Sequence, residues 1–301
     1  MKIAPFFRLL FAAAALTATA ASAQPAAPAP EKELLIVDFF NRIREIPAPY
    51  TETLRGHVLD GFAARGRHRL LDAEASRVLA ATAPGTGITD PATAEADMAA
   101  LLAARAPEAV ALGARYLVSG TLAAYRFDHV DLPPAASGKP PRPGFKAAFR
   151  VILSGLDLKL GTRLPDEAFD LTASAPAATD ADLAALARIR GSLEYYIDRN
   201  FKFETQILEL CPADRKGRLR ELYIHSGTAM GVKRGDLFLV YEEVPVGGVI
   251  TRQKVGRLRV TDAANPEVAR CKVAKGDDEI ARAFAAGRTL ICVSDGKAFG
   301  Y

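Results

Sequence analysis

The stretch LLIVDFF at residues 34–40 is the segment that decides the fold of the first part of the chain. It is a continuous apolar run of strand length, the pattern of a β-strand buried on both faces. A helical pattern follows from about Thr51, with Leu54, Val58 and Phe62 on one face. A buried strand followed by an amphipathic helix predicts an α/β layer in which helices cover a sheet.

The same patterns continue outward to Phe201. Apolar runs and alternation predict strands at 68–72, 116–127, 146–160 and 167–174. Helical spacing and capping signals predict helices at 74–80, from Asp90-Pro91 onward with a new turn at Pro107, and at 180–201. The alternation of strands and helices extends the α/β domain over residues 32–201.

Two irregularities are expected within this domain. The apolar phase of the strand at 146–160 shifts by one residue around Ser154-Gly155, which predicts a β-bulge there. The polar, Pro-rich segment 131–144 predicts a mobile hairpin loop. It lacks the alternating strands of about 9–11 residues that a membrane-crossing barrel needs, so a pore is disfavoured.

From residue 202 the pattern changes to short strands separated by Gly-containing turns. Strands are predicted at 204–210, 218–225, 236–241, 254–261, 267–273 and 289–293, with one helix at 278–286. Six short strands predict a small β-barrel of the SH3-like kind. The expected fold class is therefore α+β, with a mixed sheet flanked by helices at 32–201 and a small barrel at 202–301.

The N-terminus has the features of a secretory signal peptide. Lys2 and Arg8 precede an apolar run, and Ala21-Ser22-Ala23 supplies a small-residue cleavage site before Gln24. We expect residues 1–23 to be removed, residues 24–31 to form a Pro/Ala linker, and the mature chain to be periplasmic. Gln24 stands where a lipoprotein carries its acylated Cys, so the chain is expected not to be lipidated.

Composition narrows the classes of partner. Removing the signal peptide leaves 37 Lys and Arg against 35 Asp and Glu, a formal charge of +2. That balance gives no reason to expect nucleic acid as a partner. No later stretch is apolar enough for a transmembrane helix. The expected partners are envelope proteins or cell-wall and outer-membrane components, and a homo-oligomer is an open alternative.

Residue types that could carry catalysis are scattered. None of His57, His68, His129 and His225 has a partner at the spacing of a triad or a metal site. Ser119 lacks a nucleophile elbow. Gly85-Thr86-Gly87 lacks the Lys and Ser or Thr of a phosphate loop. We expect no catalytic residue, metal or cofactor, and hence no enzyme.

Three cysteines, Cys211, Cys271 and Cys292, fall in the barrel segment without metal-site spacing. Alternation points Cys271 into the barrel together with Ala269 and Val273. One disulfide among the three is an open alternative to three buried thiols. Pairing Cys211 with Cys292 would tie the first barrel strand to the last, and pairing Cys271 with Cys292 would join neighbouring strands.

The barrel segment is locally basic. Arg252, Lys254, Arg257 and Arg259 lie within eight residues, and alternation puts Arg257 and Arg259 on one strand face. They form a candidate patch for an anionic partner such as lipopolysaccharide, peptidoglycan or an acidic protein surface. The alternative is a solvated face balanced by nearby carboxylates of Glu242, Glu243 and Asp262.

The order of elements resembles a known periplasmic α/β family. The residues that carry this are the strand at 34–40, HRLLD at 68–72, GARYLVSGTL at 113–122 and the turn Gly161-Thr162. The family includes the curli secretion lipoprotein CsgG, the N-terminal domain of TolB, the lipoprotein activators of penicillin-binding proteins and the middle domain of flagellar assembly protein T.

The barrel segment resembles the barrel that follows the middle domain in flagellar assembly protein T. Gly227, GVKRGD at 231–236 and VGRLRV at 255–260 carry the likeness. These motifs are structural, so the resemblance implies a fold and a scaffolding role rather than an activity. The expected function is a non-enzymatic envelope assembly or scaffolding protein; the alternative is an oligomeric, curli-type secretion or channel-associated component.

Overall fold

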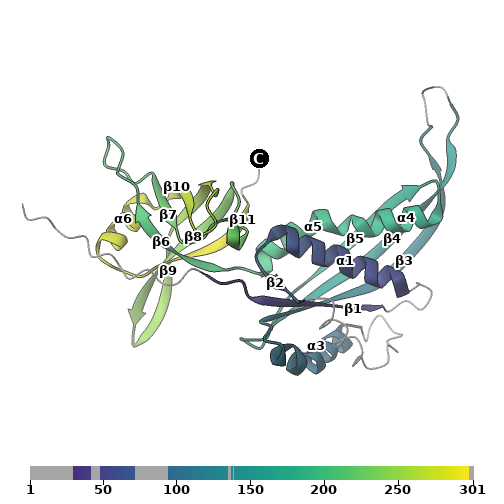
Figure 1. The fold of residues 1–301 in the computed structure, drawn as a ribbon, viewed down its shortest axis with the longest axis horizontal. Coiled ribbons are helices and arrows are strands. Elements are labelled where there is room, and N and C mark those ends of the chain that lie inside the picture. Colours follow the sequence, from purple (N-terminus) through teal and green to yellow (C-terminus); the bar gives the residue numbers. More distant parts are fainter. Residues whose placement is uncertain (1–29, 42–47, 72–93, 135–136, 138, 298–301) are drawn as a thin grey trace, which may run out of the picture.

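The computed structural model describes residues 30–41, 48–71, 94–134, 137 and 139–297. It contains a mixed five-stranded sheet with helices, followed by a closed six-stranded antiparallel barrel (Figure 1). The predicted α+β fold class is confirmed. The predicted signal peptide, most of the linker, the helix at 74–80 and the Asp90-Pro91 cap lie outside the described residues.

The sheet has the strand order β2-β1-β3-β4-β5. Its strands are β1 (Leu34–Asn41), β2 (Arg69–Leu70), β3 (Tyr116–Leu132), β4 (Arg142–Asp157) and β5 (Thr162–Ala175). β1 pairs in parallel with both β2 and β3, whereas β3, β4 and β5 are antiparallel neighbours. The long antiparallel strands therefore extend the sheet to one side of the parallel β1.

Residues 34–37 of β1 are buried on both faces, as their apolar sequence predicts. Leu35 and Val37 point into the core under the helices on one face, and Leu34 and Ile36 point into a second, smaller core on the other. Alternating side chains of a strand emerge on opposite faces, so only a continuous apolar run can serve both cores. The apolar residues 34–37 thus serve the helical layers on both sides of the sheet.

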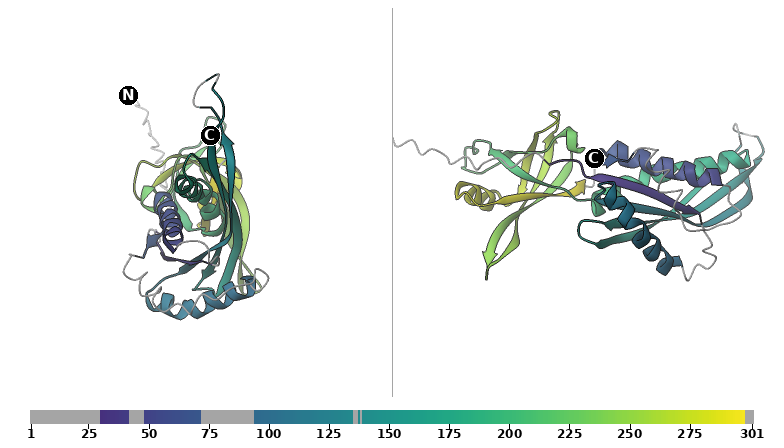
Figure 2. Two further views of the ribbon diagram at one scale, coloured as in Figure 1. Left: turned by 90° about the vertical axis from the view of Figure 1, so that its right-hand side faces the viewer. Right: turned by 60° about the horizontal axis from the view of Figure 1, so that its bottom comes forward.

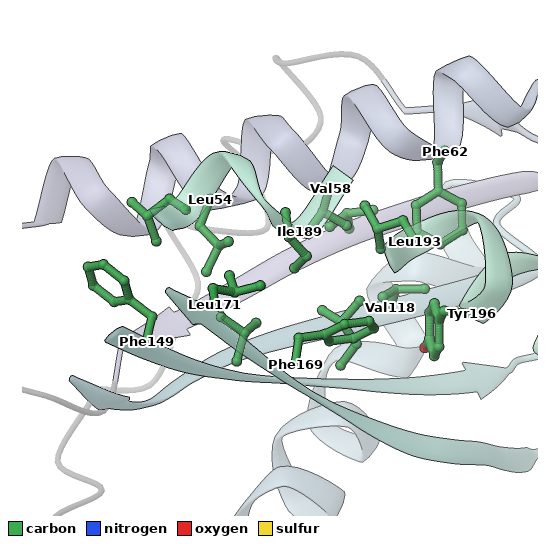
Figure 3. Close-up of a cluster of buried hydrophobic side chains, with 14 of the residues drawn as sticks. Leu54, Val58, Phe62, Val118, Phe149, Phe169, Leu171, Ile189, Leu193 and Tyr196 are labelled. Carbon is green, nitrogen blue, oxygen red and sulfur yellow. The ribbon is translucent and has the colours of Figure 1, made fainter. Parts of the chain in front are cut away.

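Three helices cover the first face: α1 (Ala48–Arg65), α4 (Ala178–Ala187) and α5 (Ile189–Asn200). Figure 3 shows Leu54, Val58 and Phe62 of α1 directed towards Ile189 and Leu193 of α5 and the strands below. The other face is covered by α3 (Ala94–Ala111), which lies on the far side of the sheet in both Figure 1 and Figure 2. The sheet is thus enclosed between two helical layers over its parallel part.

The helix predicted at 180–201 is two helices, α4 and α5, which meet at Arg188. The N–H of Arg188 bonds the carbonyl of Ala185, and the N–H of Gly191 bonds that of Arg188, so the ladder tightens locally to three-residue spacing. α3 runs on through Pro107, where a new turn was predicted. Buried Leu102 and Ala109 hold both halves of α3 to the sheet despite the missing N–H.

The Pro-rich insertion is a hairpin, but the predicted loop at 131–144 is too long. β3 runs to Leu132 and β4 begins at Arg142, with continuous pairing from Leu132 with Arg142 inward. Pro143 still has no N–H to donate, yet it takes its place in this pairing. The Pro-rich composition therefore predicted strand ends that are too early. The ends of β3 and β4 extend beyond the helices (Figure 1).

The pairing irregularity predicted near Ser154-Gly155 is confirmed, but its sequence signal has a different cause. The register of β4 with β5 shifts between Leu153 and Gly155, whereas β4 stays in regular register with β3 there. Leu153 faces the core under α1, and Leu156 packs instead against the core under α3. The apolar phase changes because the strand begins to serve the second core, not because it bulges.

The barrel closes in the order β10-β7-β6-β11-β8-β9. Its strands are β6 (Glu204–Leu210), β7 (Glu221–Ile224), β8 (Asp236–Val246), β9 (Val249–Asp262), β10 (Ala269–Lys275) and β11 (Leu290–Lys297). A short 3₁₀ turn, Thr228–Met230, and the helix α6 (Asp277–Ala285) complete it. β8 and β9 are much longer than the predicted 236–241 and 254–261. Among the described residues, no helix is long and apolar enough to cross a membrane.

His68 lies in an aromatic cluster at the base of the first core. Its ring meets those of Phe62, Tyr116 and Phe201 edge to face, with centroids 5.2–5.7 Å apart. Burial, together with the nearby charges of Arg67 and Arg115, lowers the pKa of His68 to about 3. His68 is therefore a neutral core residue at physiological pH.

This burial makes the folded protein sensitive to acid. Below its ordinary pKa of 6.5 the unfolded chain binds a proton at His68, whereas the folded chain does so only near pH 3, so stability falls across that window. Between pH 7.5 and 5.0 we expect His68→Phe to lose ~2 kcal/mol less unfolding free energy than the wild type. Urea unfolding at the two pH values measures this, with His129→Phe at an exposed position as control. Equal losses in wild type and His68→Phe would refute the assignment.

Candidate functional site

The C-terminal end of α1 meets the barrel through one buried side chain, Arg65. Its Nε donates to Asp198 Oδ1 of α5 at 2.7 Å, and its Nη2 donates to Asp236 Oδ2 of β8 at 2.9 Å. Its Nη1 donates to the carbonyl of Gly231 in the turn before β8. One guanidinium thus bonds three segments, two of them in the barrel, and the GVKRGD motif at 231–236 lies at the domain junction.

At this junction of the two domains, the buried carboxylates of Asp198 and Asp236 balance the positive charges of Arg65 and Arg67. Burial alone would lower the pKa of Arg65, but Asp236 and Asp198 outweigh it, and the pKa is raised. Arg67 forms a second ion pair with Asp198 at 2.8 Å and lies 5.4 Å from the Phe203 ring centroid. Burial and the charge of Arg65 lower the pKa of Arg67 to about 10. Arg65 and Arg67 remain charged at neutral pH, with their counter-charges buried beside them.

Backbone contacts bring the two domains close. A Cβ built on Gly231, whose φ is +66°, would lie 2.1 Å from the carbonyl oxygen of Arg65. Lys233 donates from Nζ to the carbonyl of Ala64 at 3.1 Å, and its N–H donates to Asp236 Oδ2 at 3.0 Å. At the rim, Lys297 of β11 pairs with Glu194 of α5 at 2.6 Å. The turn at 231–236 fits against the end of α1 only because position 231 has no side chain.

The β8–β9 hairpin projects from the side of the barrel, downward in Figure 1 and largely across the direction that joins the two domains. Its strands pair as far as Val246 with Val249, and the turn between them is Gly247-Gly248, both at positive φ. At this tip Val246, Val249 and Ile250 are 58%, 65% and 68% exposed. Three aliphatic side chains therefore lie exposed together at the tip of one hairpin.

The predicted basic patch is placed on the outer wall of the barrel. Arg257 and Arg259 lie on one face of β9, between buried neighbours. Arg252 pairs with Glu204 and Glu243, and Arg257 pairs with Asp295 at 3.2 Å. Lys254 is exposed and makes no ion pair with the described residues. Binding of an anionic partner here stays a prediction, with two of its arginines already paired to carboxylates.

All three cysteines are free thiols in the structure. The interpretation that Cys271 and Cys292 lie on neighbouring strands is wrong, because β10 pairs with β7 and β9, whereas β11 pairs with β6 and β8. Cys292 pairs with Thr205, roughly 20 Å along β6 from Cys211 at the rise of a strand, too far to bridge. Burial raises the pKa of Cys271 to about 12 and also raises that of Cys292.

The remaining candidates do not come together. His57 is on α1, His129 is exposed on β3, and His225 follows β7 in the barrel. Ser119 is buried within β3, opposite Ser154 of β4. Gly85-Thr86-Gly87 lies outside the described residues. Within the described ranges, no group of three or more His, Cys, Asp or Glu side chains could hold a metal ion.

Sequence patterns missed the two main features. The apolar and glycine run VPVGGVI at 244–250 contains the Gly-Gly signal of a two-residue hairpin between β-branched residues, and it could have identified the β8–β9 tip. Arg65 and Asp198 gave no signal, because isolated charges on helices are ordinary surface residues, and neither did Arg67 in the short connection from α1 to β2. Only tertiary structure reveals that they meet.

Comparisons with known proteins find distant similarity to solved structures. A lipoprotein, GNA1162 from Neisseria meningitidis, has 11% identity and a TM-score of 0.37, covering 56% of this chain and 100% of its own. A PelC dodecamer from Paraburkholderia phytofirmans has 13% identity and a TM-score of 0.29, covering 55% and 89%. The LpoB C-terminal domain from Salmonella enterica has 13% identity and a TM-score of 0.24, covering 49% and 86%. No protein-family model and no curated protein matches the chain. These identities and TM-scores do not place it in a family.

Proposed function

We propose that this chain is an exported, non-enzymatic scaffolding protein of the bacterial cell envelope that binds a partner protein through the tip of its β8–β9 hairpin. The observation that carries the proposal is the exposed aliphatic tip formed by Val246, Val249 and Ile250. Such a tip is costly to leave in water and gains free energy by entering an apolar pocket.

The rest of the molecule supports a presenting role for the hairpin. The junction around Arg65 joins the sheet domain to the strand β8, which itself leads into the tip. A rigid element loses little conformational entropy on binding, which favours affinity. The sheet domain then serves as the platform that fixes the direction in which the tip points.

The test replaces Val249 with a photo-crosslinking phenylalanine analogue in the producing bacterium. We expect irradiation to give one dominant adduct with an envelope protein, identified by mass spectrometry, and a matched label at exposed Leu160 to give none. Val249→Ser with Ile250→Ser should abolish this partner's binding in a purified system and change the unfolding free energy by less than ~0.5 kcal/mol, since both positions are exposed. Adducts of equal yield at both labelled positions, or none, would refute docking through the tip.

A further inference from the structure

A second surface lies between the two domains, on the side of α5. A cavity of about 390 Å³ opens between α5 and the end of β11. Its size falls in the range of sites for small ligands or for one segment of a polymer. Its walls come from both domains, so it exists only because the junction holds α5 and β11 together.

The chemistry of the walls is unusual for a small-molecule site. Among the described residues, they carry three acidic and three basic side chains, one tyrosine and two glycines, and no aliphatic side chain. The acidic and basic groups pair with one another or with near neighbours: Lys297 with Glu194 at 2.6 Å, and Lys202 with Asp295 at 3.7 Å. The cavity therefore offers many hydrogen-bond donors and acceptors but no excess of either charge.

Of the described residues that line the cavity, Tyr195 supplies the aromatic surface. Its side chain is 57% exposed, and the guanidinium of Arg199 lies 6.0 Å from its ring centroid. An exposed ring beside a polar cavity can stack against the C–H face of a flat, polar molecule while the surrounding groups bond its rim. The apolar surface of the described walls belongs to this ring and to the methylene stems of charged side chains, and an anion would meet as many carboxylates as cations.

The Glu194–Lys297 and Lys202–Asp295 pairs of this cavity are more exposed than the pairs of Arg65 with Asp198 and Asp236. The side chains of Glu194, Lys202 and Lys297 are 41–43% exposed. Exposed pairs contribute about 0–1 kcal/mol, so they can exchange partners with a ligand at little cost. Vicinal hydroxyl groups both donate and accept, and they suit alternating carboxylate and ammonium groups better than a singly charged ligand does.

We propose that the cavity between α5 and β11 is a binding site for a neutral, hydroxyl-rich saccharide, with Tyr195 as the stacking platform and the Glu194–Lys297 and Lys202–Asp295 pairs as its hydrogen-bonding rim. In an exported protein such a ligand is a segment of an envelope glycan. The site is separate from the β8–β9 tip, so each can fail without the other.

The test titrates the mature chain with N-acetylchitotriose and follows saturation transfer by NMR. We expect weak binding, with a Kd of about 1 mM, and at least a tenfold loss in Tyr195→Ala. Tyr195→Phe keeps the ring, so its Kd for the trisaccharide should lie within threefold of the wild-type value. This variant distinguishes loss of ring stacking from a disturbed fold. Lys297→Ala should weaken binding by removing one donor.

Three outcomes would overturn the proposal. The first is an absence of saturation transfer from the trisaccharide to the wild type. The second is unchanged binding by Tyr195→Ala. The third is binding of a charged peptide in competition with, and more tightly than, the saccharide, which would assign the cavity to a peptide. Thermal unfolding of each variant shows whether its fold is intact. Because Tyr195 is exposed, its substitution should leave the unfolding temperature unchanged.

Discussion

Arg65→Met is expected to lower the unfolding free energy by about 3–5 kcal/mol, because it leaves the buried carboxylates of Asp198 and Asp236 without their shared counter-charge. Both carboxylates are almost fully buried. Met keeps an unbranched apolar stem in place of the arginine methylenes, so the loss chiefly reports the charge and hydrogen bonds of the guanidinium group. Urea unfolding followed by circular dichroism measures it.

The matched control is Arg190→Met. Arg190 pairs with Asp60 at 2.6 Å, but both side chains are more than half exposed, so its loss should be at most about 1 kcal/mol. Adding Asp236→Asn to Arg65→Met should recover part of the stability, since it removes the buried carboxylate that lost its arginine, whereas Asp198 keeps its pair with Arg67. Equal effects of the changes at Arg65 and Arg190 would show that the junction pairs contribute no more than surface pairs.

Gly231→Ala is expected to destabilise the protein by at least about 3 kcal/mol, through two additive causes. Its φ of +66° is strained for alanine, and the new methyl group would lie 2.1 Å from the carbonyl oxygen of Arg65. That oxygen belongs to the backbone at the end of α1, which cannot move aside without parting the domains. The barrel turn and α1 should separate, and thermal unfolding should become two transitions.

Gly217→Ala separates strain from contact. Gly217 has a φ of +73°, close to that of Gly231, but a Cβ there would meet nothing within 4 Å. Gly217→Ala should therefore lower the unfolding free energy by only about 1 kcal/mol, and its thermal unfolding should remain a single transition. If the two glycine variants lower the unfolding free energy equally, then the close approach of the two domains is not the reason that position 231 requires a glycine.

The sequence predicted the fold where each segment serves one role. β1 and the apolar face of α1 follow directly from periodicity, because their burial repeats with the geometry of strand and helix. The six barrel strands are recognisable for the same reason. The predicted element boundaries were wrong at Arg188, where one expected helix is divided into α4 and α5. They were also wrong where strands extend beyond the core, as in the hairpins β3–β4 and β8–β9.

The candidate sites were mostly beyond prediction. Arg65 and Asp198 lie 133 residues apart, and nothing in their local sequence distinguishes them from exposed charges. Tyr195 is likewise an ordinary residue of an amphipathic helix until β11 is placed beside it. The basic residues on β9 were visible in the sequence, but the carboxylates that pair with Arg252 and Arg257 come from other strands. A charge pattern in the sequence predicts which strand face the basic side chains occupy. Only the tertiary structure shows whether carboxylates from other strands already pair with them.

The most direct test of the central claim, that the barrel presents its hairpin in a fixed direction from the sheet domain, is a distance distribution between the two domains. Spin labels at Thr172→Cys on β5 and Gln253→Cys on β9, in a Cys211→Ser background, place both probes at exposed positions. Pulsed electron spin resonance should give one narrow distribution, and Arg65→Met should broaden it. A broad distribution with Arg65 intact would contradict the account, because the domains would then move independently.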